Sequence, residues 1–202
     1  DALGQKLFAL MTDGAESDLN LTENTQPALM AVSMAVIPAL RAETGINIAD
    51  KISYVAGHSL GEYSALTAIG AFDISTSAKL LKLRGQAMQR AVPVGVGSMA
   101  AILGLEIDDV RAIVREAQAM NKGVVEVAND NSSGQIVISG HADVVAAAME
   151  LATAKGAKRA LLLPVSAPFH CSLMKPAADE MREALSNVTI APLSVPVIAN
   201  VI

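Results

Sequence analysis

Residues 52–71 read Ile-Ser-Tyr-Val-Ala-Gly-His-Ser-Leu-Gly-Glu-Tyr-Ser-Ala-Leu-Thr-Ala-Ile-Gly-Ala. An apolar run, predicted to be a buried strand over 52–57, passes through Gly-x-Ser-x-Gly into a helix predicted over 60–71. In such a tight turn Gly57 and Gly61 leave room for the backbone, and the hydroxyl of Ser59 is lifted clear at a helix N-terminus. We therefore predict an α/β protein with Ser59 as a nucleophile. A structural turn with a capping serine is the alternative.

The composition excludes several classes of protein. The chain has 202 residues, of which 52% are hydrophobic and 17% charged, so it can bury a core and is not disordered. A net charge of −5 argues against general nucleic-acid binding. The longest apolar stretch, residues 28–40, contains Pro38 and is too short to span a bilayer. The single cysteine, Cys171, excludes an internal disulfide and a cysteine-rich metal site, and it favours a reducing compartment, so we expect a cytoplasmic protein.

The remaining elements follow from hydrophobic periodicity. Helices are predicted over about 24–43, ending at Gly45, and over about 75–92, before Pro93. Beyond residue 97 we expect strands and helices in the order 99–105, 107–120, 124–128, 135–139, 142–155 and 159–165. This β-α-β-β-α-β order is that of the ferredoxin-like unit. We expect it to form a subdomain of residues 97–164, inserted into a body formed by residues 1–96 and 165–202.

The helix predicted over 75–92 carries an arginine on its apolar side. At about 100° per residue Lys79 and Lys82 lie on one side, whereas Arg84 falls among leucines on the other. A buried guanidinium stays charged and requires an anion, and its planar fork suits a carboxylate. The partner is either a protein carboxylate, since structural Arg–Asp pairs are the commoner case, or the carboxylate of a substrate.

Three histidines are candidates for the base that a nucleophilic serine needs. His58 adjoins Ser59 and points away from it on a tight turn, and His141 opens a predicted helix, where a capping or surface role is expected. His170 follows the last strand of the predicted subdomain, in a loop of the kind that usually carries catalytic groups. By elimination His170 is the predicted base, with a packed loop histidine as the alternative. A pairing of His170 with its neighbour Cys171 has poor geometry.

Four separated segments resemble the family of malonyl-CoA:acyl carrier protein transacylases. They are Gly57-His-Ser-Leu-Gly-Glu62, Arg84-Gly-x-x-Met-Gln89, Asn131-Ser-Ser-Gly-Gln-Ile-Val-Ile-Ser-Gly-His141 and Val165-Ser-Ala-Pro-Phe-His-Cys-Ser-Leu-Met174. Because all four occur in the right order, the resemblance covers essentially the whole chain. It implies an α/β-hydrolase-like body interrupted by a ferredoxin-like subdomain.

The resemblance also assigns roles to individual residues. It implies that Ser59 is acylated, that His170 acts as general base and later as acid, and that the amide of Leu60 is one oxyanion donor. It makes Arg84 the binder of the malonyl carboxylate. The residues implied to line or border the malonyl and pantetheine pocket are His58, Met88, Asn129 and Asn131. Phe169 resembles the malonyl-type form of its motif.

The implied reaction transfers malonyl from malonyl-CoA to the phosphopantetheine thiol of acyl carrier protein, in fatty acid biosynthesis. The intermediate is a malonyl-serine, and no metal or redox cofactor is expected. The expected partners are acyl carrier protein and a coenzyme A thioester, without nucleic acid or membrane, and the protein is expected to be a monomer. The family normally opens with a Gly-Gln-Gly-Ser-Gln loop and ends beyond residue 202, so we expect this chain to be a fragment lacking both ends.

Three alternatives share parts of this pattern. A serine esterase or thioesterase would use the same turn with an acid between serine and histidine, for which Asp130 and Asp143 are candidates. An acyltransferase domain of a polyketide-type synthase would share every motif. A non-catalytic module could bind a carrier protein, and the basic cluster of Lys155, Lys158 and Arg159 could meet an acidic partner, although a solvated surface cluster is the commoner case.

Overall fold

The computed structural model describes residues 2–201, which fold into two units. The first comprises residues up to Gln86 together with those from Met181 onward, and the second comprises Ala87–Glu180. The protein is a mixed α/β structure, as predicted. Two helices, α5 (Ile74–Ala91) and α8 (Lys175–Ser186), contribute residues to both units.

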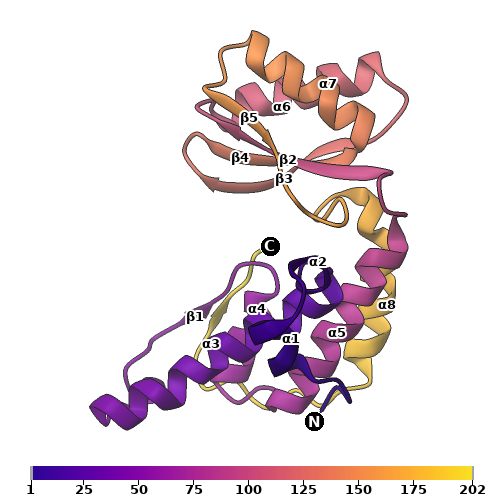
Figure 1. Ribbon diagram of the computed structural model, residues 1–202. Helices are drawn as coiled ribbons and strands as arrows, with labels where there is room; N and C mark the ends of the chain where they lie inside the picture. The colour runs from indigo at the N-terminus through magenta and orange to yellow at the C-terminus, as the bar shows by residue number, and fades with distance from the viewer. Residues whose placement is uncertain (1, 202) are drawn as a thin grey trace. The chain divides into compact units, whose positions relative to one another are not determined.

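Helices make up most of the first unit. Strand β1 (Val55–Ala56) pairs in parallel with β6 (Val197–Ile198), with Val55 opposite Val197, and the two strands run side by side in Figure 1. The further elements of this unit are α1 (Leu7–Asp13), α2 (Glu16–Leu19), α3 (Thr22–Thr44), a 3-10 turn η1 (Ile48–Asp50) and α4 (Gly61–Ala68). Helix α3 ends where the sequence predicts, at Gly45, whose φ of 71° closes the last turn.

The strand predicted over 52–57 is wrong in both length and burial. Only Val55 and Ala56 belong to β1, and the side chain of Tyr54 is 61% exposed. The physical reason is that, among the described residues, β1 has one partner strand of only two residues, so no sheet covers the rest of the run. The turn at Ser59 thus follows a strand that is paired over only two residues.

Helices α3 and α5 cross so closely that their backbones nearly touch at Gly85. A Cβ atom on Gly85 would lie 2.4 Å from the Cα atom of Glu23, on the first turn of α3. Met30 of α3 and the α5 residues Ala78 and Leu81 form a small buried cluster beside this crossing, against which Leu60 packs. Because Arg84 precedes Gly85, the crossing brings the arginine to the start of α3.

The second unit is a four-stranded antiparallel sheet with two helices. The strands lie in the order β3-β4-β2-β5, and both helices pack on the same face (Figure 1). Along the chain the elements are β2 (Gly97–Leu103), α6 (Ile107–Met120), β3 (Val125–Ser132), β4 (Gln135–His141), α7 (Ala142–Ala154), β5 (Arg159–Leu162) and a 3-10 turn η2 (Ser172–Met174). This is the succession of strands and helices that periodicity predicts, with bounds shifted by a few residues.

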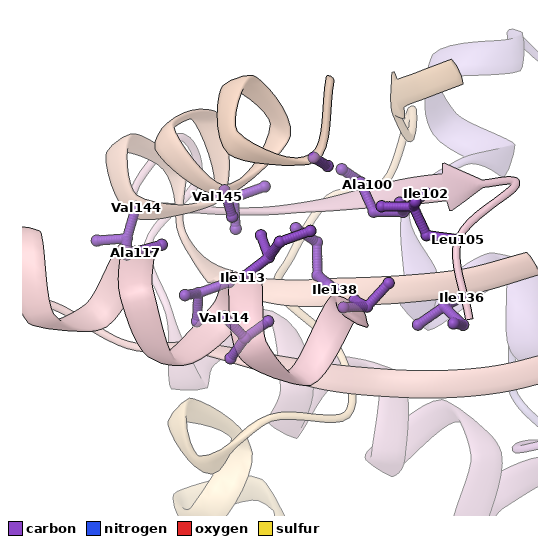
Figure 2. Close-up of a cluster of buried hydrophobic side chains, with 14 residues drawn as sticks. Ala100, Ile102, Leu105, Ile113, Val114, Ala117, Ile136, Ile138, Val144 and Val145 are labelled. Atoms are coloured by element: carbon purple, nitrogen blue, oxygen red, sulfur yellow. The ribbon is translucent and has the colours of Figure 1, made fainter. Parts of the chain in front are cut away.

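The core of this unit follows from the alternation of side chains along its strands and from their spacing of three or four residues along its helices. On β2 and β4 every second residue points at the helices, including Ile102 and Ile138, and on α6 the residues three or four apart, such as Ile113 and Ala117, point back (Figure 2). Each fully buried Ile or Val contributes about 1.5–3 kcal/mol relative to an exposed one. The sheet is therefore a stable base for the loop that carries His170.

The crossing of α3 and α5 gives the first testable prediction. Gly85→Ala should destabilise the protein by about 1–3 kcal/mol because the new methyl group meets backbone atoms. In an ordinary helix interior the same change would stabilise by about 0.5–1 kcal/mol. A matched control is Gly61→Ala in α4, where a Cβ atom would meet nothing within 4 Å. Thermal unfolding of both variants measures the difference, and equal Tm values would contradict the close approach of the helices.

Candidate active site

Ser59 occupies a strained turn between β1 and α4. Its φ is 53°, in the left-handed region that residues with a side chain rarely adopt. A Cβ atom on Gly57 would lie 2.0 Å from the backbone of Gly61, so the turn can close only with glycine at position 57. The expectation for the second glycine is wrong, because a Cβ atom on Gly61 would meet no described atom within 4 Å.

Only two described residues other than glycine have positive φ, and they are the predicted nucleophile and the predicted base. Ser59 has a φ of 53° and His170 a φ of 58°. A non-glycine residue in this conformation costs about 1–3 kcal/mol and persists where its surroundings over-determine it, which is commonest at functional sites. The strain therefore singles out the two residues independently of any sequence motif.

Among the described residues around Ser59, some backbone N–H groups already donate hydrogen bonds, and another is free to bind an oxyanion. The N–H of Gly61 donates to the carbonyl of His58 at 2.9 Å, and the N–H of Glu62 donates to the carbonyl of Ser59 at 3.2 Å. The N–H of Leu60, in contrast, donates to no acceptor among the described residues. A free amide directly after the serine, at the start of α4, can hold an oxyanion.

Asn200, which lies just after β6 and belongs to no recognisable sequence motif, holds the turn together through its side chain. Its Oδ1 accepts the N–H of Ser59 at 3.1 Å, and its Nδ2 donates to the carbonyl of Gly57 at 2.6 Å. The same Nδ2 donates to the carboxylate of Glu62 at 2.6 Å, and the backbone N–H of Asn200 donates to that carboxylate at 3.2 Å. The parallel pairing of β1 with β6 brings the ends of both strands to the same edge, where these groups meet.

Arg84 lies against the hydroxyl of Ser59. Its Nη2 donates to Ser59 Oγ at 3.0 Å, and its Nη1 donates to Gln26 Oε1 at 2.6 Å. No carboxylate lies within 4.0 Å of its side-chain nitrogens in the described part of the chain. Burial lowers the pKa of the Arg84 guanidinium, while Tyr63 and Glu62 act in the opposite direction. A guanidinium stays charged at ordinary pH, so Arg84 carries its positive charge without an ion-pair partner among the described residues.

The turn that carries His170 is anchored within the second unit. Beside it, Ser172 donates from its backbone N–H at 2.8 Å and from its hydroxyl at 2.7 Å to the carboxylate of Glu126 on β3. The thiol of Cys171 donates to the carbonyl of Pro168 at 3.2 Å, and burial raises its pKa. A raised pKa disfavours the thiolate that a cysteine nucleophile needs, which argues against Cys171 as the nucleophile.

The remaining predicted residues fall into two groups. Met88 is 6% exposed and belongs to a buried cluster against which Phe169 packs, so these two residues share one apolar site of the second unit. Asn129 and Asn131 lie on β3, where its register shifts against β4. His58 is exposed beside Ser59. The capping role expected of His141 is wrong, because its Nδ1 accepts the N–H of Val124 at 2.8 Å and the side chain makes no cap.

No metal cluster of three His, Cys, Asp or Glu side chains occurs among residues 2–201, and no helix there has the length and hydropathy that crossing a bilayer requires. The turn at Ser59 is that of α/β proteins in which a serine is raised between a strand and a helix. Comparison with known families defines this class further. The chain belongs to the acyl transferase domain family, which it matches over residues 1–201.

Relatives with curated names agree with this family. The chain is 46% identical over 200 residues to the malonyl CoA-acyl carrier protein transacylase of Escherichia coli K12, which covers 99% of this chain and 63% of the relative. It is 45% identical to the transacylase of that name from Bacillus subtilis strain 168, over 100% of this chain and 62% of the relative. The chain thus spans less than two thirds of the length of these relatives.

Solved structures share its fold. The acyl-carrier-protein S-malonyltransferase of Bartonella henselae is 54% identical with a TM-score of 0.93, over 100% of this chain and 63% of that one. The malonyl-transacylase solved in complex with a holo type II PKS acyl-carrier protein is 43% identical with a TM-score of 0.92, again over 100% and 63%.

The hydrogen bonds of the Asn200 side chain to Ser59 and Gly57 give a prediction for the turn. Asn200→Ala removes the acceptor of the Ser59 amide, so that amide should exchange its hydrogen faster, by roughly fivefold for the loss of a bond worth about 1 kcal/mol. Exchange at Ile102, in the core of the second unit, is the internal control. Unchanged protection of Ser59 would show that the turn does not depend on Asn200.

Proposed function

We propose that this chain is the catalytic part of an enzyme that transfers malonyl from malonyl-CoA to acyl carrier protein. The observation that carries the proposal is the pairing of Arg84, a partly buried cation without a carboxylate partner among the described residues, with the hydroxyl of Ser59. In a malonyl group attached to Ser59, a single methylene separates the ester carbonyl carbon from the free carboxylate. A cation beside Oγ is therefore well placed to meet that carboxylate. The names of the relatives in Escherichia coli and Bartonella henselae support the same substrate.

In the proposed mechanism His170 accepts the hydroxyl proton of Ser59 as Oγ attacks the thioester carbonyl. The Arg84 bond occupies a lone pair of Oγ and leaves the O–H free to be donated. The amide of Leu60 holds the oxyanion of the tetrahedral intermediate, and the thiol of coenzyme A leaves with the proton from His170. The phosphopantetheine thiol of acyl carrier protein then attacks the malonyl ester in the same way and regenerates Ser59.

Arg84 is also the proposed source of selectivity. A malonyl carboxylate would pair with the guanidinium through two hydrogen bonds, whereas an acetyl group would leave the partly buried charge unpaired. Such polar discrimination exceeds what a pocket can achieve by size alone. Met88 and Phe169, which pack together in the second unit, are proposed to wall the acyl pocket, and His58, Asn129 and Asn131 are proposed to border it.

The finer features of the fold and the setting belong to the same proposal. We propose an α/β-hydrolase-like body, residues 1–96 and 165–202, with a ferredoxin-like subdomain at residues 97–164. The β-α-β-β-α-β succession that begins with β2 at Gly97 and ends with β5 at Leu162 supports it. Acyl carrier protein is the proposed partner, in the cytoplasm and in fatty acid biosynthesis. Polyketide synthesis is the second candidate, because one relative was solved with a type II PKS acyl-carrier protein.

The proposal is tested by intact-protein mass spectrometry on the protein in its full encoded length, after brief exposure to malonyl-CoA. We expect a malonyl adduct that is absent from Ser59→Ala and disappears when holo acyl carrier protein is added. Release of free malonate without acylation of the carrier protein would establish a hydrolase instead. An adduct that persists in Ser59→Ala would place the nucleophile elsewhere.

Arg84→Ala should lower malonyl transfer far more than acetyl transfer. The expected loss of malonyl kcat/KM is roughly 10- to 100-fold, the scale of a charge-assisted hydrogen-bonded pair. Arg90→Ala is the matched control, because Arg90 lies on the same helix in an exposed ion pair with Glu180 and should leave both rates within about twofold. An equal loss for both acyl groups in Arg84→Ala would make the arginine a structural residue.

A further inference from the structure

We propose that Gln26 is a positioning residue that sets the acyl selectivity of Ser59, because its neutral amide fixes the Arg84 guanidinium without neutralising it. The inference rests on the proposed malonyl transfer and adds a residue to which no catalytic motif points. Gln26 lies in the second turn of α3 and never contacts the acyl chain in this scheme. It acts through Arg84 alone.

The orientation of the Gln26 amide follows from its partners. The side chain is 3% exposed, and its Nε2 donates to the hydroxyl of Thr22 at 2.8 Å. Its Oε1 accepts Arg84 Nη1 at 2.6 Å, and this assignment is forced because a guanidinium has donors and no acceptor. A buried amide that is held at both ends has one orientation, so it fixes the plane of the Arg84 fork.

The close approach of α3 and α5 supports this side-chain geometry. Gly85 lets α5 approach α3 so closely that a Cβ atom on it would lie 2.7 Å from the carbonyl oxygen of Thr22. Thr22, which orients Gln26, and Gly85, which follows Arg84, therefore lie at the same helix crossing. The arginine and its neutral partner are placed by rigid helices rather than by a loop.

The acidic residues closest in sequence to the site form no ion pair with Arg84, although the charge of Glu62 favours the charged form of the guanidinium. The carboxylate of Glu62 accepts the side-chain and backbone N–H groups of Asn200, and the carboxylate of Glu23 pairs with Lys82 at 3.4 Å. A neutral amide is thus the acceptor at Nη1, while Nη2 contacts the hydroxyl of Ser59. The positive charge stays available for an anion that arrives with the substrate. A carboxylate in place of the amide would satisfy the same hydrogen bond and cancel that charge.

The test replaces the amide by the isosteric acid. Gln26→Glu should lower kcat/KM for malonyl-CoA roughly 10- to 100-fold, the scale of a lost charge-assisted pair, and change the rate of Ser59 acetylation from acetyl-CoA by less than about threefold. The ratio of the two rates, measured on one preparation of the full-length protein, is the decisive readout. Gln135→Glu, the same chemical change at an exposed position of β4, is the control and should leave the ratio unchanged.

A second variant covers the case in which Gln26→Glu does not fold. Gln26→Met keeps the volume and removes the acceptor, so Arg84 loses its fixed orientation and malonyl transfer should again fall more than acetyl transfer. Equal losses for both acyl groups, or an unchanged ratio in a folded variant, would overturn the inference. If wild type itself forms no malonyl adduct, the proposed function fails, whereas an adduct in wild type together with an unchanged ratio in the variants defeats the role of Gln26 alone.

Discussion

A partly buried positive charge that forms no ion pair with any described carboxylate is the constraint on which the site in the first unit depends. Arg84 can be tolerated there because two neutral oxygens, of Gln26 and Ser59, accept its hydrogen bonds. The bond to Gln26 requires the close packing of α5 against α3 that Gly85 makes possible. An ordinary ion pair would be simpler to bury, but it would leave the cation without attraction for a further anion.

Backbone strain at Ser59 and His170 is sustained by polar contacts on either side of each residue. At Ser59 the side chain of Asn200 spans the turn from Gly57 to Glu62, and next to His170 the carboxylate of Glu126 accepts two bonds from Ser172. Each strained residue costs about 1–3 kcal/mol, a sum that a few well-formed hydrogen bonds can offset. The left-handed conformation is therefore specified by the surrounding structure and does not arise from the local sequence.

Sequence reasoning succeeded where local chemistry decides the outcome. Periodicity predicted the helices and strands from β2 to β5, and the Gly-x-Ser-x-Gly pattern predicted the turn at Ser59. It failed where a distant partner decides, since the length of β1 is set by β6, some 140 residues later in the chain. The roles of Asn200 and Gln26 could not be predicted from the sequence for the same reason. An isolated Asn after a strand or Gln in a helix has no distinctive pattern, and each gains meaning only from the partner that the fold supplies.

One cation that contacts the nucleophile and is also proposed to recognise the acyl group links two tasks that are usually separate. In the proposed reaction the guanidinium that donates to Oγ at 3.0 Å would lie beside the ester once Ser59 is acylated. An acyl chain with its own carboxylate would then pair with the guanidinium, whereas a neutral acyl chain would leave it to water. Selectivity would thus be exerted on the covalent intermediate itself. This requires that the partner of Arg84 inside the protein be neutral, because an acidic residue at that place would satisfy the cation in every state and remove the difference between the two acyl groups.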